Sequence, residues 1–548
     1  MLITARRIRS FLAVLVLFAF VARTQAERPR IGPIIIGVES LPEIERDPPA
    51  SDATLRARTT SPPMFATRGS FISVQVNVDA QGDNIVGDAA NEPTIAINPQ
   101  NPDQIVIAWR QFDSILSDFR QAGNAFSTDA GTTWTFPGVL DPGQFRSDPV
   151  LGTDLSGNFY FSSLSAVDSA QVFKSSDGGA NWGTPVDAFG GDKQWLSVHD
   201  VAGLGSGNVY QNWNSQFSCC GIDDFTRSIN GAASFPDTDS IPSPKMKWGT
   251  LDVGPDGTLY FAGAELNSFN GHLFTKSANA KNPVSAVTFD AISSIDLGGF
   301  TATGGINPQG LLGQVWIATD HSGGPTDGNI YVLGSVVVDA SPNVIDVMFI
   351  RSTDGGANWT APIPVNDDSD GAWHWFGTMS VAPNGRIDVI WNDTRNDPGN
   401  FLTELFYSFS VDGGQTFSTN VPVSPSFDPS LGYPQQSKLG DYYGMISDND
   451  GAGVAYAATF NGEQDVYFLR IPGPPSCSLA CGDLDNSGGP VNLQDFATFA
   501  NCFGLLPSNV PDCVCSDLNG DLIIDLNDFS TFALNFDGLS TNSPPSCP

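Results

Sequence analysis

Apolar and polar residues alternate over short runs from about residue 69 onward, and these runs recur in groups. The first run, residues 71–78, reads Phe-Ile-Ser-Val-Gln-Val-Asn-Val. Further runs follow at 93–97, 105–109 and 158–161, separated by clusters of Gly, Asn and Asp. Alternation with a period of two predicts β-strands, and such clusters predict tight turns. The pattern therefore predicts an all-β domain over residues 69–472.

A short phrase, Ser-x-Asp-x-Gly-x-x-Trp/Phe, follows the third strand of several groups. Clear copies begin at Ser127, Ser175, Ser352 and Ser410. The Asp carboxylate can accept backbone N–H bonds within a turn, the Gly supplies a positive φ, and the aromatic ring covers the turn. Each copy predicts a hairpin between two short antiparallel strands. Weaker copies contain Asn230 and Asn279 in place of the Asp.

The spacing of these phrases predicts the architecture. Their centres lie at positions 129, 177, 230, 279, 354 and 412, so the gaps are 48, 53, 49, 75 and 58 residues. A four-stranded propeller blade takes about 40–50 residues, and insertions account for the longer gaps.

One more unit follows the last phrase and supplies three strands, near 442–446, 453–458 and 465–470. The unpaired run 71–78 can serve as its fourth strand, which would close the ring and remove its open edges. The sequence therefore favours a β-propeller of seven blades closed by an N-terminal strand. A ring of six blades is the alternative.

The repeated phrase resembles the Asp-box, or bacterial neuraminidase repeat, of sialidases and related β-propellers. The four clear copies extend the resemblance over most of residues 69–472. It implies a propeller fold. In those families the box is a structural turn far from the ligand, so the box does not by itself imply an activity.

Composition excludes some partners. The chain of 548 residues carries 59 acidic and 25 basic side chains, for a net charge of −34. An acidic body repels nucleic acid and anionic membranes, so neither is expected as a partner. The acidity suits Ca2+-rich extracellular surroundings, and a role in solubility alone explains it equally well.

The first residues predict export. Arg6, Arg7 and Arg9 precede an apolar run at 11–21 and then Thr-Gln-Ala at 24–26. This order is typical of a secretory signal peptide, here residues 1–26, and predicts a secreted protein without membrane insertion. Residues 27–68, rich in Pro, Arg and Thr, are interpreted as a flexible linker.

A second domain is predicted at residues 473–548. Two Asp-rich loops each precede a helix with regularly spaced aromatics. The second loop places oxygen donors at positions 1, 3, 5, 9 and 12, which is EF-hand spacing for Ca2+. Its donors are Asp517, Asn519, Asp521, Asp525 and Asp528, and those of the first loop are Asp483, Asp485, Ser487 and Asp495.

The paired loop–helix unit resembles dockerin repeats over about 60 residues. The resemblance implies Ca2+ binding and a cohesin-like protein as a partner. An acidic turn without metal remains the alternative for each loop.

Eight cysteines in an exported chain predict disulfides. Six lie in the C-terminal domain, where cross-links from Cys477 or Cys481 to Cys502, Cys513 or Cys515 are expected. The adjacent pair Cys219 and Cys220 is expected to stay unlinked, because neighbouring Cα atoms lie closer together than is usual for a disulfide.

Candidate chemistry is expected at one mouth of the propeller, where first strands begin and second strands end. The resemblance to sialidases suggests a three-arginine clamp for a substrate carboxylate, an acid, a tyrosine nucleophile and a glutamate that assists it. The residues that fit these roles are Arg110, Arg146 and Arg395, Asp148, Tyr442, and Glu265, respectively.

Two non-catalytic alternatives stay open. Aromatic rings suit sugar faces, so the propeller can bind a glycan or a protein through Trp195, Trp213, Trp248, Trp373 and Trp375, unless these rings fill the core. It can also be a scaffold component recruited through the C-terminal domain. The four scattered histidines predict no zinc site. The function predicted is recognition of extracellular glycans or polysaccharide, with glycoside hydrolysis left open.

Overall fold

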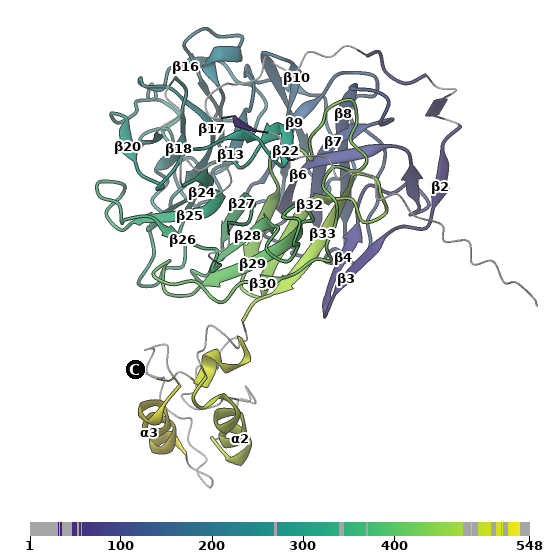
Figure 1. Cartoon of the computed structure of the whole chain (residues 1–548). Helices are drawn as coiled ribbons and strands as arrows, with labels where there is room; N and C mark the ends of the chain where they lie inside the picture. The colour runs from purple at the N-terminus through teal and green to yellow at the C-terminus, as the bar shows by residue number, and fades with distance from the viewer. Residues whose placement is uncertain are drawn as a thin grey trace, which may run out of the picture.

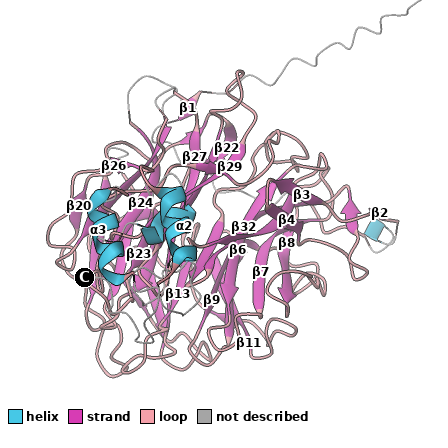
Figure 2. Cartoon of the chain, turned by 90° about the horizontal axis from the view of Figure 1, so that it is seen from below, coloured by secondary structure: helices cyan, strands magenta, loops and turns pink. Residues whose placement is uncertain are grey.

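The structure is a computed structural model that describes most of residues 57–474 and parts of 31–55 and 484–536. Within residues 57–474 it consists mainly of antiparallel β-sheets arranged around one axis (Figures 1 and 2). Several long strands, such as Ile105–Phe112 and Ile330–Val337, are buried along their whole length, because both faces of their sheets are covered. No helix in the described part of the chain is long and apolar enough to cross a membrane.

Seven sheets form the ring, and each runs from an innermost strand outward. The first three consist of β6 (Ala89–Ile97), β7 (Ile105–Phe112) and β8 (Arg120–Ser127); β9 (Ser147–Thr153), β10 (Phe159–Ala166), β11 (Ser169–Ser175) and β12 (Val186–Asp187); and β13 (Trp195–Val198), β14 (Val209–Asn212), β15 (Phe225–Ser228) and β16 (Thr238–Asp239). A short 3-10 helix, η1 (Ser215–Phe217), lies between β14 and β15.

The fourth to sixth sheets follow the same plan. They consist of β17 (Met246–Val253), β18 (Leu259–Glu265), β19 (His272–Ser277) and β20 (Ser293–Ile295); β23 (Trp316–Thr319), β24 (Ile330–Val337), β25 (Ile345–Ser352) and β26 (Ile363–Pro364); and β27 (His374–Val381), β28 (Ile387–Asp393), β29 (Glu404–Ser410) and β30 (Val421–Pro422).

The seventh sheet joins the two ends of the propeller. From the inside outward it contains β31 (Gly444–Asp448), β32 (Gly451–Ala458), β33 (Asp465–Pro472), β4 (Phe71–Gln75) and β3 (Phe65–Arg68). β4 pairs antiparallel with β33 in the register Val74 to Phe468. The predicted closure by an N-terminal strand is therefore confirmed.

The innermost strands contact one another in a closed circle. β6, β9, β13, β17, β23, β27 and β31 each touch the next, and β31 touches β6. The ring thus has seven blades, as the sequence favours, and the six-bladed alternative is wrong.

The repeated phrase forms the predicted turn. In the copy at 352–359, the Ser352 hydroxyl accepts a bond from Gly356 N at 2.9 Å, and Asp354 Oδ1 accepts one from Asn358 N at 2.8 Å. The bonds from the side chain and backbone of Asn358 lower the pKa of Asp354 to about 2. The weak copy keeps this geometry, because Asn230 Oδ1 accepts from Ser234 N at 3.1 Å.

Residues 27–68 were expected to be a linker, but the described parts of this segment pair with the propeller. β1 (Ile34–Ile35) pairs with β21 (Thr303–Gly304), which pairs in turn with β22 (Asn307–Leu311). β2 (Thr59–Ser61) pairs with β5 (Asn84–Val86). Composition did not reveal these pairings because the strands are only two or three residues long.

The C-terminal segment contains two helices, α2 (Leu493–Cys502) and α3 (Leu526–Asn535), and a 3-10 helix, η3 (Pro511–Ser516). Phe499 and Phe532 stack with their ring centroids 5.3 Å apart and occupy a small core. A disulfide joins Cys502 to Cys513. Cys515 is also disulfide-bonded, whereas Cys477 and Cys481 lie outside the described residues.

Candidate functional site

The central channel is filled by aromatic rings from three different blades. Trp195 of the third sheet packs edge-on against Trp316 of the fifth, with ring centroids 5.2 Å apart. Trp195 also packs against Tyr442, which precedes β31 in the seventh sheet, again at 5.2 Å. Such edge-to-face contacts are favourable in a close-packed interior. The rings form a plug across the middle of the propeller.

A network of buried charges adjoins this plug. Lys193 Nζ lies 2.5 Å from Asp441 Oδ2 and 3.5 Å from Asp148 Oδ1. Lys438 Nζ lies 2.9 Å from Asp441 Oδ2 and 3.4 Å from Glu92 Oε1. Burial acts to raise the pKa of Asp441, but the two ammonium groups hold it well below its usual range.

Arg110 completes the network, because its Nη2 lies 3.1 Å from Glu92 Oε1 and neither side chain is exposed. Three cations thus face three carboxylates. A buried ionic group is tolerated when the charges are paired in this way. The network fixes blades to one another and leaves no excess charge for a ligand.

Five innermost strands share a backbone irregularity near their first residues. Each has one non-glycine residue in the left-handed region, with φ between 50° and 60°: Glu92, Asp148, Lys193, Trp248 and Phe376. Such residues cost about 1–3 kcal/mol each and persist only where the surroundings fix them. A register shift accompanies four of them, all but Lys193, and re-aims the side chain, which brings the charged groups of Glu92 and Asp148 into the network.

An insertion covers the charged network. The hairpin β21–β22, which accounts for the gap of 75 residues between two turn phrases, reaches the loop that precedes β31. Leu311 N donates to Asp441 Oδ1 at 2.9 Å, and Asn307 Nδ2 donates to the carbonyl of Gly440 at 2.8 Å. The predicted mouth is therefore capped.

The structure brings together three of the six predicted catalytic residues. Arg110, Asp148 and Tyr442 all lie in or beside the buried network. Tyr442 donates its hydroxyl to the carbonyl of Pro149 at 3.0 Å. Burial, followed by the charges of Glu92 and Asp148, raises the pKa of Tyr442 well above its ordinary value, which keeps the phenol protonated. This environment does not favour a nucleophile.

The other three predicted residues have different partners. Arg146 Nη2 donates to Asp141 and Gln171, and its guanidinium lies over the Phe173 ring. Arg395 belongs to an acidic cluster between the fifth and sixth sheets. Glu265 ends β18 in the fourth sheet. The described contacts do not join the three arginines into one clamp.

The five tryptophans considered for sugar binding are all buried. The most exposed of them, Trp195, has 8% of its surface accessible. Core packing therefore explains these rings, and none presents a free face. The sequence could not decide this, because an aromatic residue on a strand serves a core or a ligand equally well.

A groove of about 350 Å3 opens between the third and fourth sheets. Loops on the side where the innermost strands begin supply its walls. The lining consists of Ser215, Gln216, Gly221, Ile222, Ser240, Ser243, Lys245, Leu266 and Asn267. Lys245 Nζ lies 2.9 Å from Asp224 Oδ1 and bonds the Ser240 hydroxyl at 2.9 Å. The volume is within the usual range of small-ligand pockets, roughly 300–1,000 Å3.

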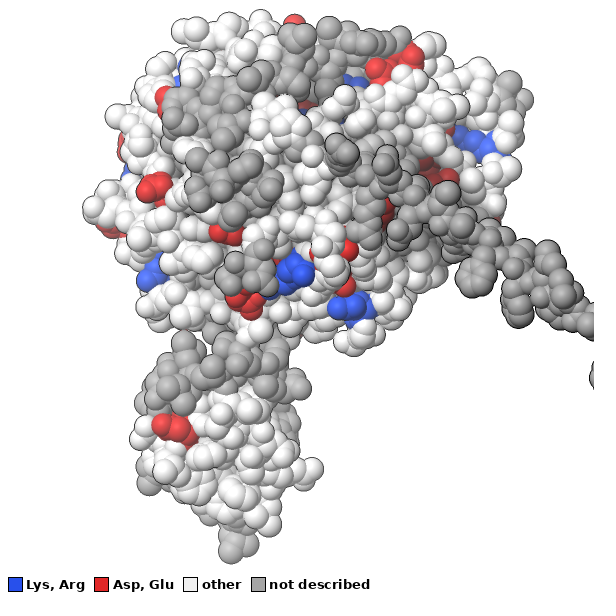
Figure 3. Space-filling model, viewed as in Figure 1, with Lys and Arg blue, Asp and Glu red and all other residues white. Residues whose placement is uncertain are grey.

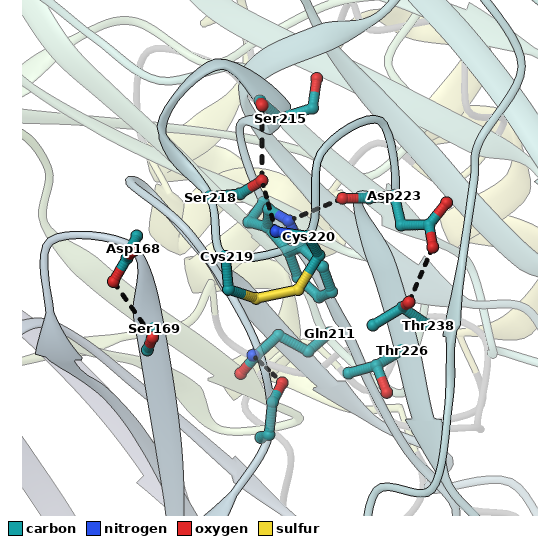
Figure 4. Close-up of a disulfide and its surroundings, with 12 residues drawn as sticks. Asp168, Ser169, Gln211, Ser215, Ser218, Cys219, Cys220, Asp223, Thr226 and Thr238 are labelled. Carbon is teal, nitrogen blue, oxygen red and sulfur yellow. Dashed lines mark hydrogen bonds between the residues drawn. A yellow bond between two sulfur atoms is a disulfide. The ribbon is translucent and has the colours of Figure 1, made fainter.

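One wall of this groove carries a disulfide between adjacent residues, Cys219 and Cys220 (Figure 4). The sequence predicted two unlinked cysteines, and this prediction is wrong. The Cys219 amide donates to the carbonyl of Asp168 at 2.8 Å, which ties the loop to the neighbouring blade. Cross-linked, anchored residues thus precede Gly221 and Ile222 of the lining.

In the C-terminal segment, two predicted calcium ligands occupy equivalent positions. Asp495 accepts bonds from Leu484 N and Asn492 N, and Asp528 accepts from Leu518 N and Asp525 N, all at 2.7–2.8 Å. Both carboxylates are fully buried. Asp525 is described as the N-cap of α3. The remaining predicted ligands, Asp517, Asn519, Asp521, Asp483, Asp485 and Ser487, lie outside the described residues.

Among the described residues on the face shown in Figure 3, no charged patch dominates. Acidic and basic side chains there are scattered among uncharged ones. This agrees with a charged fraction of only 15%.

No protein-family model and no curated protein sequence matches the chain. Among solved structures, it is similar to a protein of unknown function from Dyadobacter fermentans, at 14% identity and a TM-score of 0.41, over 74% of this chain and 99% of that one. It is also similar to YCF48 bound to a D1 peptide, at 12% and 0.42, over 79% and 100%.

A third similar structure is a Trypanosoma rangeli sialidase, at 10% identity and a TM-score of 0.35, over 76% of this chain and 59% of that one. All three TM-scores are below 0.5, so these likenesses carry no argument about activity or ligand. The seven-bladed ring is established by the strand pairing of this chain itself.

Proposed function

We propose that the protein is a secreted recognition propeller that binds a short, uncharged glycan in the groove between its third and fourth sheets. The observation that carries the proposal is the lining of this groove. Three serine hydroxyls and two side-chain amides face a space that also contains Ile222 and Leu266. Hydroxyls and amides match the donors and acceptors of a sugar, and the apolar side chains match its C–H faces.

The same lining favours binding over hydrolysis. Most glycoside hydrolases use two carboxylic side chains on either side of the scissile bond. Lys245 is the one ionisable side chain among the lining residues, and Asp224 already neutralises it. The capped and plugged channel offers the substrate no alternative entry in this structure. Sialidase-type hydrolysis is therefore the less favoured alternative.

A glycan array with the full-length protein tests the proposal. We expect binding to neutral oligosaccharides that falls at least about tenfold when Gln216→Ala and Asn267→Ala remove two amides, each hydrogen bond contributing about 1 kcal/mol. Gln415→Ala, in a different groove, serves as the matched control. Equal binding by all variants would contradict the site. Release of sugar from a fluorogenic sialoside would support sialidase-type hydrolysis instead.

We also propose that the C-terminal segment binds Ca2+ and acts as a docking module, with a cohesin-like protein as its partner. The donor set supports this, because carboxylate and amide oxygens are the ligands that Ca2+ prefers. Asp517, Asn519, Asp521, Asp525 and Asp528 would hold one ion, and Asp483, Asp485, Ser487 and Asp495 a second. Bound Ca2+ would neutralise the loops and order them.

Calorimetric titration of the full-length protein with Ca2+ tests the module. Asp517→Ala combined with Asp528→Ala should abolish uptake at the second loop. Ser530→Ala, an exposed position within α3, should leave uptake unchanged. Uptake that is the same in all three proteins would contradict the proposal.

A further inference from the structure

A histidine and two aspartates meet between the fifth and sixth sheets, away from the proposed glycan groove. His374 begins β27, Asp393 ends β28, and Asp368 lies in the loop that joins β26 to β27. His374 Nε2 lies 2.8 Å from Asp368 Oδ1 and 3.5 Å from Asp393 Oδ2. One nitrogen or oxygen atom from each residue lies within 4.8 Å of the others.

The other ring nitrogen of His374 fixes the orientation of the imidazole. Nδ1 lies 2.7 Å from the carbonyl of Ile345, which can only accept a hydrogen bond, so Nδ1 carries the proton. Burial acts to lower the pKa of His374, but the bonds to Asp346 and Asp368 raise it to about 9, so a metal ion at Nε2 would displace a proton that lies between the ring and the carboxylates. A bond from Nδ1–H to a backbone carbonyl is the usual support of a histidine that binds a metal through Nε2.

Asp368 Oδ2, a buried atom at this point, makes no hydrogen bond. His374 Nε2, in a residue that is only 2% exposed, has the carboxylates of Asp368 and Asp393 as its partners. Buried polar atoms normally have a partner, and an unsatisfied one indicates an ion or water at that place. This observation is independent of the count of acidic groups.

The charges at the cluster do not balance. Asp346, Asp367, Asp368 and Asp393 face a single permanent cation, Arg395, which lies 2.8 Å from Asp393 Oδ2 and 3.2 Å from Asp368 Oδ1. The buried network in the channel, by contrast, has equal numbers of both signs. The cluster can therefore accept a divalent cation without gaining a net positive charge.

We propose that His374 Nε2, Asp368 and Asp393 bind a divalent transition-metal ion such as Zn2+ or Mn2+. One imidazole nitrogen with two carboxylates is a ligand set for such ions rather than for Ca2+, which takes oxygen alone. Trp391 Nε1 and Arg395 Nε each donate to Asp393 Oδ2 at 2.8 Å and hold this carboxylate in place, as second-layer donors do in metal sites.

The site is open to solvent on one side. Asp368 also lines a groove of about 530 Å3 that runs between the end of the fifth sheet and the outer strands of the sixth. Asn366, Thr416 and Ser418 contribute polar groups to the same groove. A metal held by three protein ligands keeps a coordination position that water or a ligand in this groove can fill.

Metal titration of the full-length protein tests the proposal. Ca2+ is kept in excess so that the C-terminal loops are saturated, and Zn2+ or Mn2+ binding is followed by calorimetry and by metal analysis after gel filtration. We expect about one equivalent in the wild type, and affinity roughly 100-fold weaker or worse in His374→Gln and in Asp368→Asn, because losing a ligand exceeds the 10–100-fold effect of losing a supporting residue.

Two further variants make the result specific. Trp391→Phe removes only a supporting bond and should weaken binding about tenfold. His272→Gln replaces another buried histidine, which lies on β19 of the fourth sheet and bonds Thr301, and should leave the stoichiometry and affinity unchanged. The proposal would be overturned if the wild type bound neither Zn2+ nor Mn2+, or if His374→Gln and Asp368→Asn both bound the metal as tightly as the wild type. In that case a protonated His374 bridges the two carboxylates.

Discussion

At the scale of single residues, the turn phrases show why Gly occupies one position rather than another. Gly355 and Gly356 both have a positive φ, of +71° and +86°. A Cβ on Gly356 would lie 2.2 Å from the Phe274 ring of the neighbouring blade, whereas one on Gly355 would meet no atom closer than 3.5 Å. The second glycine is therefore needed for contact between blades as well as for the turn.

This difference predicts unequal costs for two similar substitutions. Gly355→Ala should lower the free energy of unfolding by about 1 kcal/mol, the cost of a left-handed alanine. Gly356→Ala should lower it by roughly 3 kcal/mol, because overpacking adds to that cost. Denaturant titration of the two variants and the wild type measures both values. Equal decreases in the free energy of unfolding would show that the Phe274 ring moves aside without cost.

His272 gives a prediction for acid stability. Burial lowers its pKa to about 4, below the usual value of 6.5. The folded protein thus binds this proton less readily than the unfolded chain, so stability is full above pH 6.5 and is lost as the pH falls through 4. Relative to His272→Gln, the wild type should lose up to about 3 kcal/mol between pH 6.5 and 4. Chemical denaturation of both proteins across that range measures the difference, and parallel curves would contradict it.

At the scale of elements, closure depends on one short strand. β4 pairs with β33, and the buried Val76 continues the ladder with a bond of 2.8 Å from its amide to the carbonyl of Val466. Without β4 the seventh sheet would end in an exposed edge, which favours pairing between molecules.

Two truncations test this role of β4. A chain that lacks residues 27–78 should unfold at a markedly lower temperature and should associate. A chain that lacks only residues 27–58 keeps β3 and β4. It should stay monomeric, and its unfolding temperature should fall by less. Thermal unfolding and light scattering report both properties. If the chain that lacks residues 27–78 stayed monomeric, closure would not require β4.

The disulfide between Cys219 and Cys220 gives a second prediction at this scale, which rests on the proposed glycan groove. The joint change Cys219→Ser and Cys220→Ser frees the loop before Gly221 and Ile222, so binding must then order it. Glycan affinity should fall several-fold, while the melting temperature of the propeller changes little because the loop lies outside the ring. Unchanged affinity would show that the anchoring bonds suffice.

At the scale of the whole molecule, the propeller and the C-terminal segment have separate cores. Ca2+ would stabilise only the segment that contains its ligands. Calorimetric scans of protein loaded with Ca2+ alone, without Zn2+ or Mn2+, should therefore show two transitions, of which EDTA lowers only the one that Asp517→Ala with Asp528→Ala also lowers. A shift of the propeller transition by EDTA in that double variant would point to a further cation in the propeller.

Much of the architecture could be read from the chain because it repeats. The turn at Asp354 is local, so its residues and its geometry are fixed by neighbours in sequence. The candidate sites could not be read in this way. Asp368, His374 and Asp393 stand on three segments, and their meeting depends on how two blades pack. The pairing of Cys219 with Cys220 contradicted an expectation drawn from general disulfide geometry alone.

The sequence by itself determined the strand repeat and the turns and favoured seven blades over six, because alternation and turn chemistry act within a few residues. Only the tertiary structure decided what became of the charged and aromatic side chains. The plug of Trp195, Trp316 and Tyr442 and the cap by β21–β22 arise from contacts between distant blades. Such contacts depend on the closed ring, so a residue such as Arg110 reads as a ligand-binding arginine in the sequence and as a buried counter-ion in the fold.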